Sequence, residues 1–248
     1  MPSEKKRSDG ERDVVDAFEE MGLFYPTASG IYIVYGAPAV GKTTLMARFA
    51  EALARRGIPA FYIGTEPNLR LYGQLTKIRS MIPTSFKCGG REVAAVEYVD
   101  SYLPLLHKLI EITASCDQAV AVVDSITALA LHEQAKYLAA TGRLDVLPVI
   151  RTVSSFANAV TQLIANNVAD RMVSVYYVAQ ERPAIGQPYH GEPAAPSFAM
   201  RAQHNVAAVA RLFITGEGGK ARRALKVVWH RAEKYVGMTK EVQVEPLL

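Results

Sequence analysis

Residues 36–44 read Gly-Ala-Pro-Ala-Val-Gly-Lys-Thr-Thr, which is a complete G-x-x-x-x-G-K-[ST] phosphate loop. In such a loop, backbone N–H groups surround phosphate oxygens, Lys42 reaches the terminal phosphates as a compact cation, and the Thr43 hydroxyl binds magnesium. The predicted nucleotide-binding residues are Gly36, Ala37, Pro38, Ala39, Val40, Gly41, Lys42, Thr43 and Thr44. The spacing predicts that the chain binds a nucleoside triphosphate together with Mg²⁺.

The segments on either side of the loop support this interpretation. An apolar run at 31–35 predicts a strand before it, and apolar residues at helical spacing predict a helix over 43–56 after it. Gly57 ends that helix, and a second apolar strand is expected at 59–65. A chance match in an ordinary strand-to-helix turn is the alternative, but the order strand, loop, helix, strand favours a βαβ unit around bound phosphate.

Asp124 follows a strand-like run, Ala119 to Val123, that is apolar on both faces. Such a run is typical of the buried middle of a parallel sheet. A carboxylate at its carboxyl end can hold magnesium, directly or through water, opposite the Thr43 hydroxyl. The alternative is that Asp124 only caps the next helix. Beside an intact phosphate loop, Thr43 and Asp124 are the predicted metal-binding residues.

Two further strand ends carry side chains suited to catalysis. Glu66 ends the strand after the phosphate-loop helix, where a carboxylate can orient or deprotonate the attacking water. Its alternative role is to favour the start of a helix expected at 67–82. Gln180 ends the strand predicted at 173–179, and its amide could contact the γ-phosphate or the water. Its alternative is simply a polar residue leaving a strand.

These elements must come from an α/β fold. Further helices are expected at about 101–115 and from 145 to 164, and strands and helices keep alternating, which predicts a mostly parallel central sheet flanked by helices. From 206 onward, strand-like runs at 206–214, 224–229 and 241–244 predict an antiparallel extension at the sheet edge. We expect residues 1–28 to form a charged leader with a short helix over 13–21, and residues 29–248 to form one core domain.

Composition limits the number of domains and the cellular compartment that we expect for the protein. The chain has 248 residues, half of them hydrophobic, which is enough for one sizeable core. Cys88 and Cys116 are too few for a disulfide framework or a zinc site, so we expect two packing residues in a reducing compartment. The polar N-terminus has no signal-peptide apolar region, and no later run is long enough to span a bilayer. A cytoplasmic protein without membrane contact is expected.

Charge is unevenly distributed. The net charge is +4, but residues 201–240 hold nine Lys or Arg against two Glu, a balance of +7 that leaves −3 for the rest. A basic block of this size can bind a polyanion such as nucleic acid. A solvated basic surface is the equally acceptable alternative.

The motifs in this order resemble the ATPase core of the RecA/RadA recombinase superfamily. The matching strings are the phosphate loop, Tyr-Ile-Gly-Thr-Glu ending at Glu66, Val-Val-Asp-Ser-Ile-Thr-Ala-Leu around Asp124, and Tyr-Val-Ala-Gln ending at Gln180. The resemblance covers about residues 25–245. It implies a RecA-like P-loop fold, ATP and Mg²⁺ as ligands, Glu66 as the catalytic base, and Gln180 as the residue leading into a DNA-binding loop. It also implies that Arg231 reaches the γ-phosphate of a neighbouring subunit, although an ordinary surface arginine is as good an account.

The same resemblance marks two candidate DNA-binding loops. The first is 131–147, with Lys136 and Arg143 as phosphate contacts, and the second follows Gln180. In the second loop the candidates for phosphate contact are Arg182, His190 and Arg201, and those for base stacking are Tyr189 and Phe198. Solvated loop charges are the alternative for all of them.

The chain also departs from full-length recombinases. It has only a short leader in place of a helical DNA-binding domain, its segment 147–164 is mostly apolar where an arginine-rich helix is expected, and Phe18 and Phe24 are weak substitutes for a subunit hook. The resemblance therefore favours an archaeal RadA paralogue of the RadB type. Such a protein would bind ATP, hydrolyse it slowly, bind single-stranded DNA, and assist a recombinase in recombination and repair, with self-association as an option. The alternatives are a KaiC-like regulatory ATPase that acts on a protein without DNA, and a structural paralogue that binds ATP without turnover.

Overall fold

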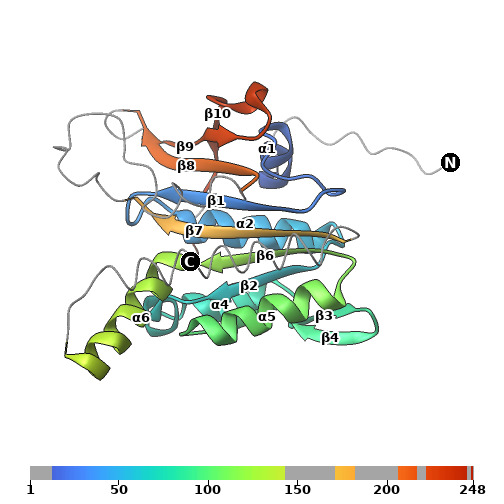
Figure 1. The fold of residues 1–248 in the computed structure, drawn as a ribbon. Helices are drawn as coiled ribbons and strands as arrows, with labels where there is room; N and C mark the ends of the chain where they lie inside the picture. The colour runs from blue at the N-terminus through green and yellow to red at the C-terminus, as the bar shows by residue number, and fades with distance from the viewer. Residues whose placement is uncertain (1–12, 143–170, 182–205, 217–221, 245–246, 248) are drawn as a thin grey trace.

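The computed structural model describes residues 13–142, 171–181, 206–216, 222–244 and 247. An eight-stranded sheet forms its centre, in the order β10-β9-β8-β1-β7-β6-β2-β5 (Figure 1). Its strands are β1 (Gly30–Gly36), β2 (Ala60–Gly64), β5 (Val96–Tyr98), β6 (Gln118–Asp124), β7 (Met172–Gln180), β8 (Ala208–Thr215), β9 (Arg222–His230) and β10 (Thr239–Val242). A separate antiparallel pair consists of β3 (Ser85–Cys88) and β4 (Arg91–Ala94).

Six neighbouring strands, from β8 to β5, run parallel, and only β9 and β10 pair antiparallel at one edge. The expected fold class, a mostly parallel α/β sheet with a C-terminal antiparallel extension, is confirmed. The extension begins one strand later than expected, because β8 lies parallel to β1 and the chain reverses only at β9.

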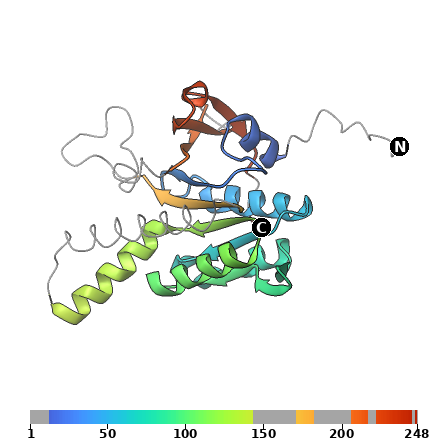
Figure 2. The ribbon, with the colours of Figure 1, turned by 45° about the vertical axis from the view of Figure 1, so that its right-hand side comes forward.

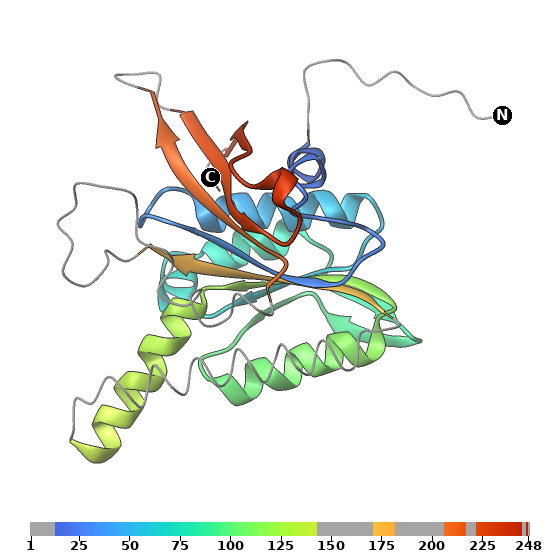
Figure 3. The same ribbon diagram turned by 45° about the horizontal axis from the view of Figure 1, so that its top comes forward.

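The helices of the described chain cover both faces of the sheet. They are α1 (Val14–Glu20), α2 (Lys42–Arg55), α3 (Pro67–Leu71), α4 (Gln74–Met81), α5 (Tyr102–Ser115), α6 (Ile126–Thr141) and the short 3₁₀ turn η2 (Glu233–Tyr235). Figure 3 shows α2 and α5 on opposite sides of the sheet. None of the helices within the described residues has the length and apolarity that a bilayer crossing requires.

Alternation along β1 divides the core into two layers. Tyr32 and Val34 pack on the face covered by α1 and α2, whereas Ile31, Ile33 and Tyr35 pack on the face covered by α5. Because both faces are buried, the strand reads as an uninterrupted apolar run in the sequence. The central strands are packed on both faces, and this packing holds the polar residues at their ends in fixed positions.

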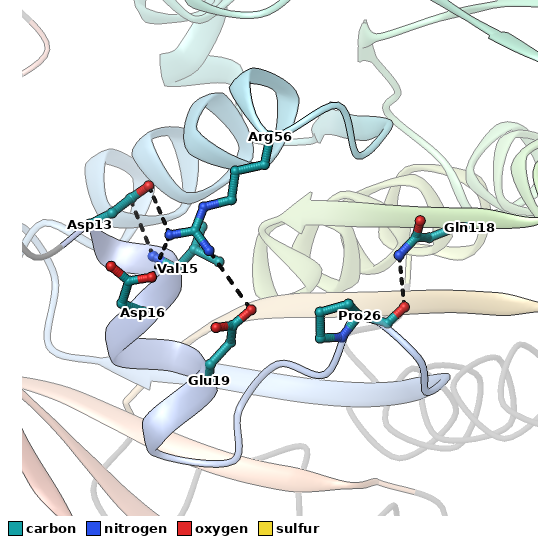
Figure 4. A network of polar contacts seen from close by, with 7 residues as sticks. All are labelled: Asp13, Val15, Asp16, Glu19, Pro26, Arg56 and Gln118. Carbon is teal, nitrogen blue, oxygen red and sulfur yellow. Dashed lines mark hydrogen bonds and ion pairs between the residues drawn. The ribbon is translucent and has the colours of Figure 1, made fainter. Parts of the chain in front are cut away.

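The leader helix α1 belongs to this core. Phe18 is fully buried and its ring stacks on Phe49 of α2 with centroids 4.3 Å apart. Arg56, just after α2, forms ion pairs with Asp13 and Asp16 of 3.2 and 2.6 Å (Figure 4). Phe24 is also buried. Neither phenylalanine is exposed on the surface where a subunit hook would have to be.

Two sequence predictions of helical and loop structure are wrong. The helix expected over 67–82 is two helices, because Gly73 adopts a left-handed conformation with φ 67° between α3 and α4. Residues 131–141, expected as part of a DNA-binding loop, continue helix α6, which projects away from the body in Figures 1 and 2. The helix expected at 145–164 lies outside the described residues.

The prediction that the two cysteines are unbonded packing residues is also wrong. Cys88 at the end of β3 and Cys116 after α5 form a disulfide, with their Cα atoms 4.6 Å apart across 28 residues of sequence. The hairpin that brings them together was not predicted. Gly89 permits the approach, because a Cβ there would lie 2.8 Å from the carbonyl oxygen of Ser115. Cysteine usage therefore gives no argument for a reducing compartment.

Candidate nucleotide-binding site

The phosphate loop joins the end of β1 to the start of α2 in the conformation that the motif predicts. Gly41 precedes the helix with φ 103°, and Ala39 has a positive φ of 60°. Helix α2 begins at Lys42, so its first N–H groups, which have no partner within the helix, lie at the loop. These N–H groups and the helix dipole both favour an anion at this position.

Lys42 is 8% exposed and folds back over the loop. Its Nζ donates to the carbonyl oxygens of Gly36 at 2.9 Å and Ala37 at 2.8 Å. Burial lowers the pKa of Lys42, and three carboxylates oppose that shift, those of Asp124, Glu66 and Glu181. The amine of Lys42 therefore lies between loop carbonyls and acidic side chains from neighbouring strand ends.

Close packing explains the glycines at both ends of the loop. A Cβ on Gly36 would overlap the carbonyl oxygen of Leu212 in β8. A Cβ on Gly41 would lie 3.1 Å from Arg223 Nε, which donates to Val40 O at 2.9 Å. Arg223 of β9, the strand next to the edge strand β10, thus holds the phosphate loop in place. In the sequence it was only one member of the basic block, and no motif distinguishes it.

The parallel register brings the predicted strand-end residues into one row. Gly36 of β1 pairs with Gln180 of β7, and Gly64 of β2 pairs with Asp124 of β6. Strand β7 lies between β1 and β6, so Gln180 stands between the phosphate loop and Asp124. Glu66 follows β2 two residues beyond Gly64. Ligands of open α/β sheets bind at this carboxyl edge.

Asp124 is buried, and its two carboxylate oxygens differ. Tyr62 Oη donates to Oδ2 at 2.5 Å, whereas Oδ1 is buried without a hydrogen-bond partner among the described residues. Burial raises the pKa of Asp124 to about 6, the neighbouring Glu66 charge adds to the rise, and hydrogen bonds from Tyr62 and Thr43 together with the Lys42 charge oppose it. A buried carboxylate with an unpartnered oxygen beside a second carboxylate favours a bound cation.

These residues fit Mg²⁺. The described part of the chain holds no group of three or more His, Cys, Asp or Glu arranged around a metal. Thr43 and Asp124 alone would supply protein oxygens, and phosphate oxygens and water would complete the octahedron, which is how Mg²⁺ is commonly held beside nucleotides. The free Oδ1 of Asp124 is the atom that suits this role.

Glu66 is directed across the row toward β6. It occupies the position before α3, but its side chain makes no capping hydrogen bond. Its Oε1 accepts a hydrogen bond from Ser125 Oγ at 2.7 Å, and Ser125 Oγ also accepts from the backbone N–H of Ala128. Ser125, and not Asp124, therefore caps α6. The helix-capping alternative for Asp124 finds no support in these contacts, whereas Glu66 does occupy the position before α3 that its alternative role requires.

Gln180 and Glu181 link the phosphate loop to other elements. The backbone N–H of Gln180 donates to Thr127 Oγ1 of α6 at 3.1 Å. The N–H of Glu181 donates to Gly36 O at 3.0 Å, and its carboxylate pairs with Arg211 at 3.0 Å. The end of β7 is thus tied to β1, to β8 and to α6 immediately before residue 182.

Arg231 lies at the amino edge of the parallel strands, whereas the phosphate loop of the same chain lies at their carboxyl edge. Strand β9 runs antiparallel to β8, so its end at His230 pairs with Ala208 at the start of β8, and Arg231 N donates to Ala207 O at 3.1 Å. The phosphate loop is at the other end of these strands. Arg231 cannot contact a phosphate bound in its own loop.

Only one candidate DNA contact falls within the described residues. Lys136 is an exposed residue of α6 whose Nζ donates to Asp100 O at 3.0 Å and pairs with Glu133 at 3.5 Å. The other candidates lie outside the described residues, namely Arg143, Arg182, Tyr189, His190, Phe198 and Arg201. Lys136 is therefore engaged within the protein in this conformation.

Part of the basic block is neutralised inside the fold. Arg211 pairs with Glu181, Arg222 with Glu241 at 2.9 Å, and Lys240 with Glu20. Arg223 binds the phosphate-loop carbonyl of Val40. At least four of the nine Lys and Arg residues of the block therefore make contacts within the protein, which the sequence alone did not reveal.

Comparisons with known proteins agree with this fold. No protein-family model and no curated protein sequence matches the chain. Among solved structures, the crystal structure of the KaiC-like protein PH0186 from the hyperthermophilic archaeon Pyrococcus horikoshii OT3 matches with a TM-score of 0.55 and 13% identity, over 88% of this chain and 87% of that one. The chain has the RecA-like P-loop ATPase fold.

Proposed function

We propose that the protein binds Mg²⁺-ATP in the Gly36–Thr44 loop and hydrolyses ATP slowly. The observation that carries the proposal is the unpartnered, buried Oδ1 of Asp124 beside the phosphate loop and Glu66. A buried polar atom without a partner in the protein requires an explanation, and a bound ion beside the phosphate loop provides one. An ordinary structural loop would give no reason to keep a carboxylate there.

Each residue of the site has a separate role in an in-line displacement at the γ-phosphorus. Water attacks the γ-phosphorus, a new P–O bond forms, and the bond to the β-phosphate oxygen breaks to release ADP and phosphate. Glu66, oriented by Ser125, accepts the proton of the attacking water. Lys42 leaves the loop carbonyls for the phosphate oxygens and neutralises charge. Mg²⁺ held by Thr43 and Asp124 would supply further neutralisation.

Arg231 could act in hydrolysis only at the phosphate loop of a second copy of the chain. Its place at the far edge of the sheet fits a head-to-tail arrangement, in which the edge of one copy faces the loop of the next. Mixing Arg231→Ala chains with Glu66→Gln chains tests this, because hybrid assemblies would regain sites that have both residues. Hydrolysis that rises on mixing supports the role in trans, and unchanged hydrolysis removes it.

Titration with a fluorescent ATP analogue tests nucleotide binding. Lys42→Ala should weaken affinity at least about tenfold, because the loop would face the triphosphate without its cation. Lys108→Ala is the matched control, since Lys108 of α5 is similarly buried, at 6%, and pairs with Glu97 of β5 and Glu111 of α5, away from the loop. Equal affinities for the two variants would refute the proposal.

We further propose that the ATP state controls association with single-stranded DNA and a recombinase. The motif order and the basic block support it, and the internal ion pairs of that block weigh against it. Anisotropy titration with single-stranded DNA at two salt concentrations decides between this and a KaiC-like regulatory role. Salt-sensitive binding that is lost in Arg182→Ala or Arg201→Ala favours DNA. No binding at low salt favours a protein partner.

A further inference from the structure

Tyr62 of β2 contacts the proposed metal-binding carboxylate from within the core. Its side chain is fully buried, and its hydroxyl donates to Asp124 Oδ2 at 2.5 Å. The parallel register pairs Tyr62 with Val122, so Tyr62 lies on the same face as Asp124, one diagonal step back along the strand.

The hydrogen bond makes the two oxygens of Asp124 inequivalent. Oδ2 is engaged by Tyr62, whereas the buried Oδ1 has no partner among the described residues. The terminal torsion of an aspartate is soft, so a fixed donor on one oxygen restricts the plane of the carboxylate. The oxygen that remains free is then presented in one direction.

We propose that Tyr62 is a positioning residue for magnesium, because its hydroxyl holds Oδ2 of Asp124 and thereby presents Oδ1 to the metal. This inference rests on the proposed function, since it concerns the same site. Groups that orient a metal ligand typically change metal affinity by about 10- to 100-fold when they are removed. Tyr62 should therefore set the magnesium requirement and leave contacts with the nucleotide itself unchanged.

A second tyrosine provides a matched control. Tyr176 of β7 is also fully buried in the same core layer, and its hydroxyl donates to Leu23 O at 2.6 Å. That bond joins β7 to the segment that follows α1, so this hydroxyl is engaged by a backbone carbonyl and not by Asp124. Tyr62→Phe and Tyr176→Phe each remove one buried hydroxyl hydrogen bond, but only the first should affect magnesium.

The experiment titrates the full-length protein with a fluorescent ATP analogue at a series of Mg²⁺ concentrations and again in EDTA. We expect Tyr62→Phe to need roughly 10 to 100 times more Mg²⁺ for half of the metal-dependent gain in affinity. Its affinity in EDTA should stay within about twofold of wild type, because Tyr62 positions a ligand for the metal and not for the phosphates. Tyr176→Phe should keep the wild-type magnesium requirement.

Two non-natural residues at position 62 distinguish the loss of the hydrogen-bond donor from a folding defect. 4-Fluorophenylalanine restores the volume of tyrosine without a donor and should retain the raised requirement, whereas 4-aminophenylalanine restores a donor and should recover most of the affinity. A wild-type magnesium requirement in the folded 4-fluorophenylalanine protein, or an equal loss in EDTA, would overturn the inference while ATP binding stands. Absence of nucleotide binding by the wild type would overturn both the inference and the proposed function.

Discussion

At the amino edge of the parallel sheet, polar side chains tie down neighbouring loops, whereas at the carboxyl edge they surround the phosphate loop. Gln118, at the start of β6, donates to Pro26 O at 2.7 Å, and Arg56 pairs with Asp13 and Asp16 of α1 (Figure 4). His230 contacts Gly22 O at 2.9 Å. These bonds hold the chain that enters β1 and the end of α2.

The carboxyl edge contrasts with this arrangement. Asp124 Oδ1 has no partner within the described chain, and Lys42 is satisfied by carbonyls of its own loop. Buried charge in this state lowers stability, while the same charge is stabilised when phosphate and Mg²⁺ are bound. The difference is what we expect if one edge serves folding and the other, as we propose, binds a ligand.

The largest expected effect falls on turnover at the carboxyl edge. Glu66→Gln should lower single-turnover ATP hydrolysis by about 10²- to 10⁴-fold, because a neutral amide cannot accept the proton of water. Binding of the ATP analogue should change little. The amino-edge control Glu19→Gln, which removes an ion pair of 3.8 Å with Arg56, should leave turnover intact. Wild-type turnover in Glu66→Gln would contradict the assignment.

The next largest effect is expected for the disulfide, which joins the end of β3 to Cys116, the residue after α5, near the amino edge of β6. Replacing both Cys88 and Cys116 by Ser should lower the free energy of unfolding by roughly 3–4 kcal/mol, because a closed loop spanning 28 residues restricts the unfolded chain. Urea denaturation under non-reducing conditions measures this. ATP affinity of the folded variant should equal that of wild type, and a loss of affinity would show that the two edges are coupled.

Asp124 should make the stability of the metal-free protein depend on pH. Its folded pKa of about 6 lies above the ordinary 3.8, so ionisation between these pH values penalises the folded state, and stability falls as pH rises. Above pH 6 the penalty is on the order of 2–3 kcal/mol. In EDTA, Asp124→Asn should therefore be more stable than wild type at pH 7.5 and equally stable near pH 4. Lower stability of the variant at pH 7.5 would contradict this.

The smallest effect belongs to a single amino-edge hydrogen bond. Gln118→Ala removes the donor to Pro26 O and should lower the free energy of unfolding by about 1 kcal/mol. Thermal unfolding compared with wild type measures it. The magnesium dependence of ATP binding should not move, because the bond lies at the end of β6 opposite Asp124.

The sequence was sufficient for the fold class and for the row of strand ends. The periodicity of apolar residues and the spacing of the motifs predicted β1, α2, β2, β6 and β7, because long apolar runs and glycine-rich turns are local signals. Short elements were missed. Strands β3 and β4 are short and mostly exposed, so their sequences show no clear alternation of apolar and polar residues. The break between α3 and α4 depends on a positive φ at Gly73, which a glycine permits but does not require.

Within the site, the residues named by motifs were predicted and those that support them were not. Ser125, Tyr62 and Arg223 act through contacts between strands or between a strand and the loop, which depend on register. Tyr62 had a usable signal, since alternation in two parallel strands places it on the face of Asp124. Arg223 had none, because the order of β9 beside β8 and β1 is a tertiary property.

Hydrogen exchange with and without Mg²⁺ and a non-hydrolysable ATP analogue tests the contrast between the two edges most directly. We predict slower exchange at residues 36–46, 62–68 and 122–128, at the carboxyl edge, and unchanged exchange at residues 21–30 and 116–119, at the amino edge. Lys42→Ala should abolish the protection. Protection confined to the amino edge, or none at saturating ligand, would contradict the assignment of the carboxyl edge as the Mg²⁺-ATP site.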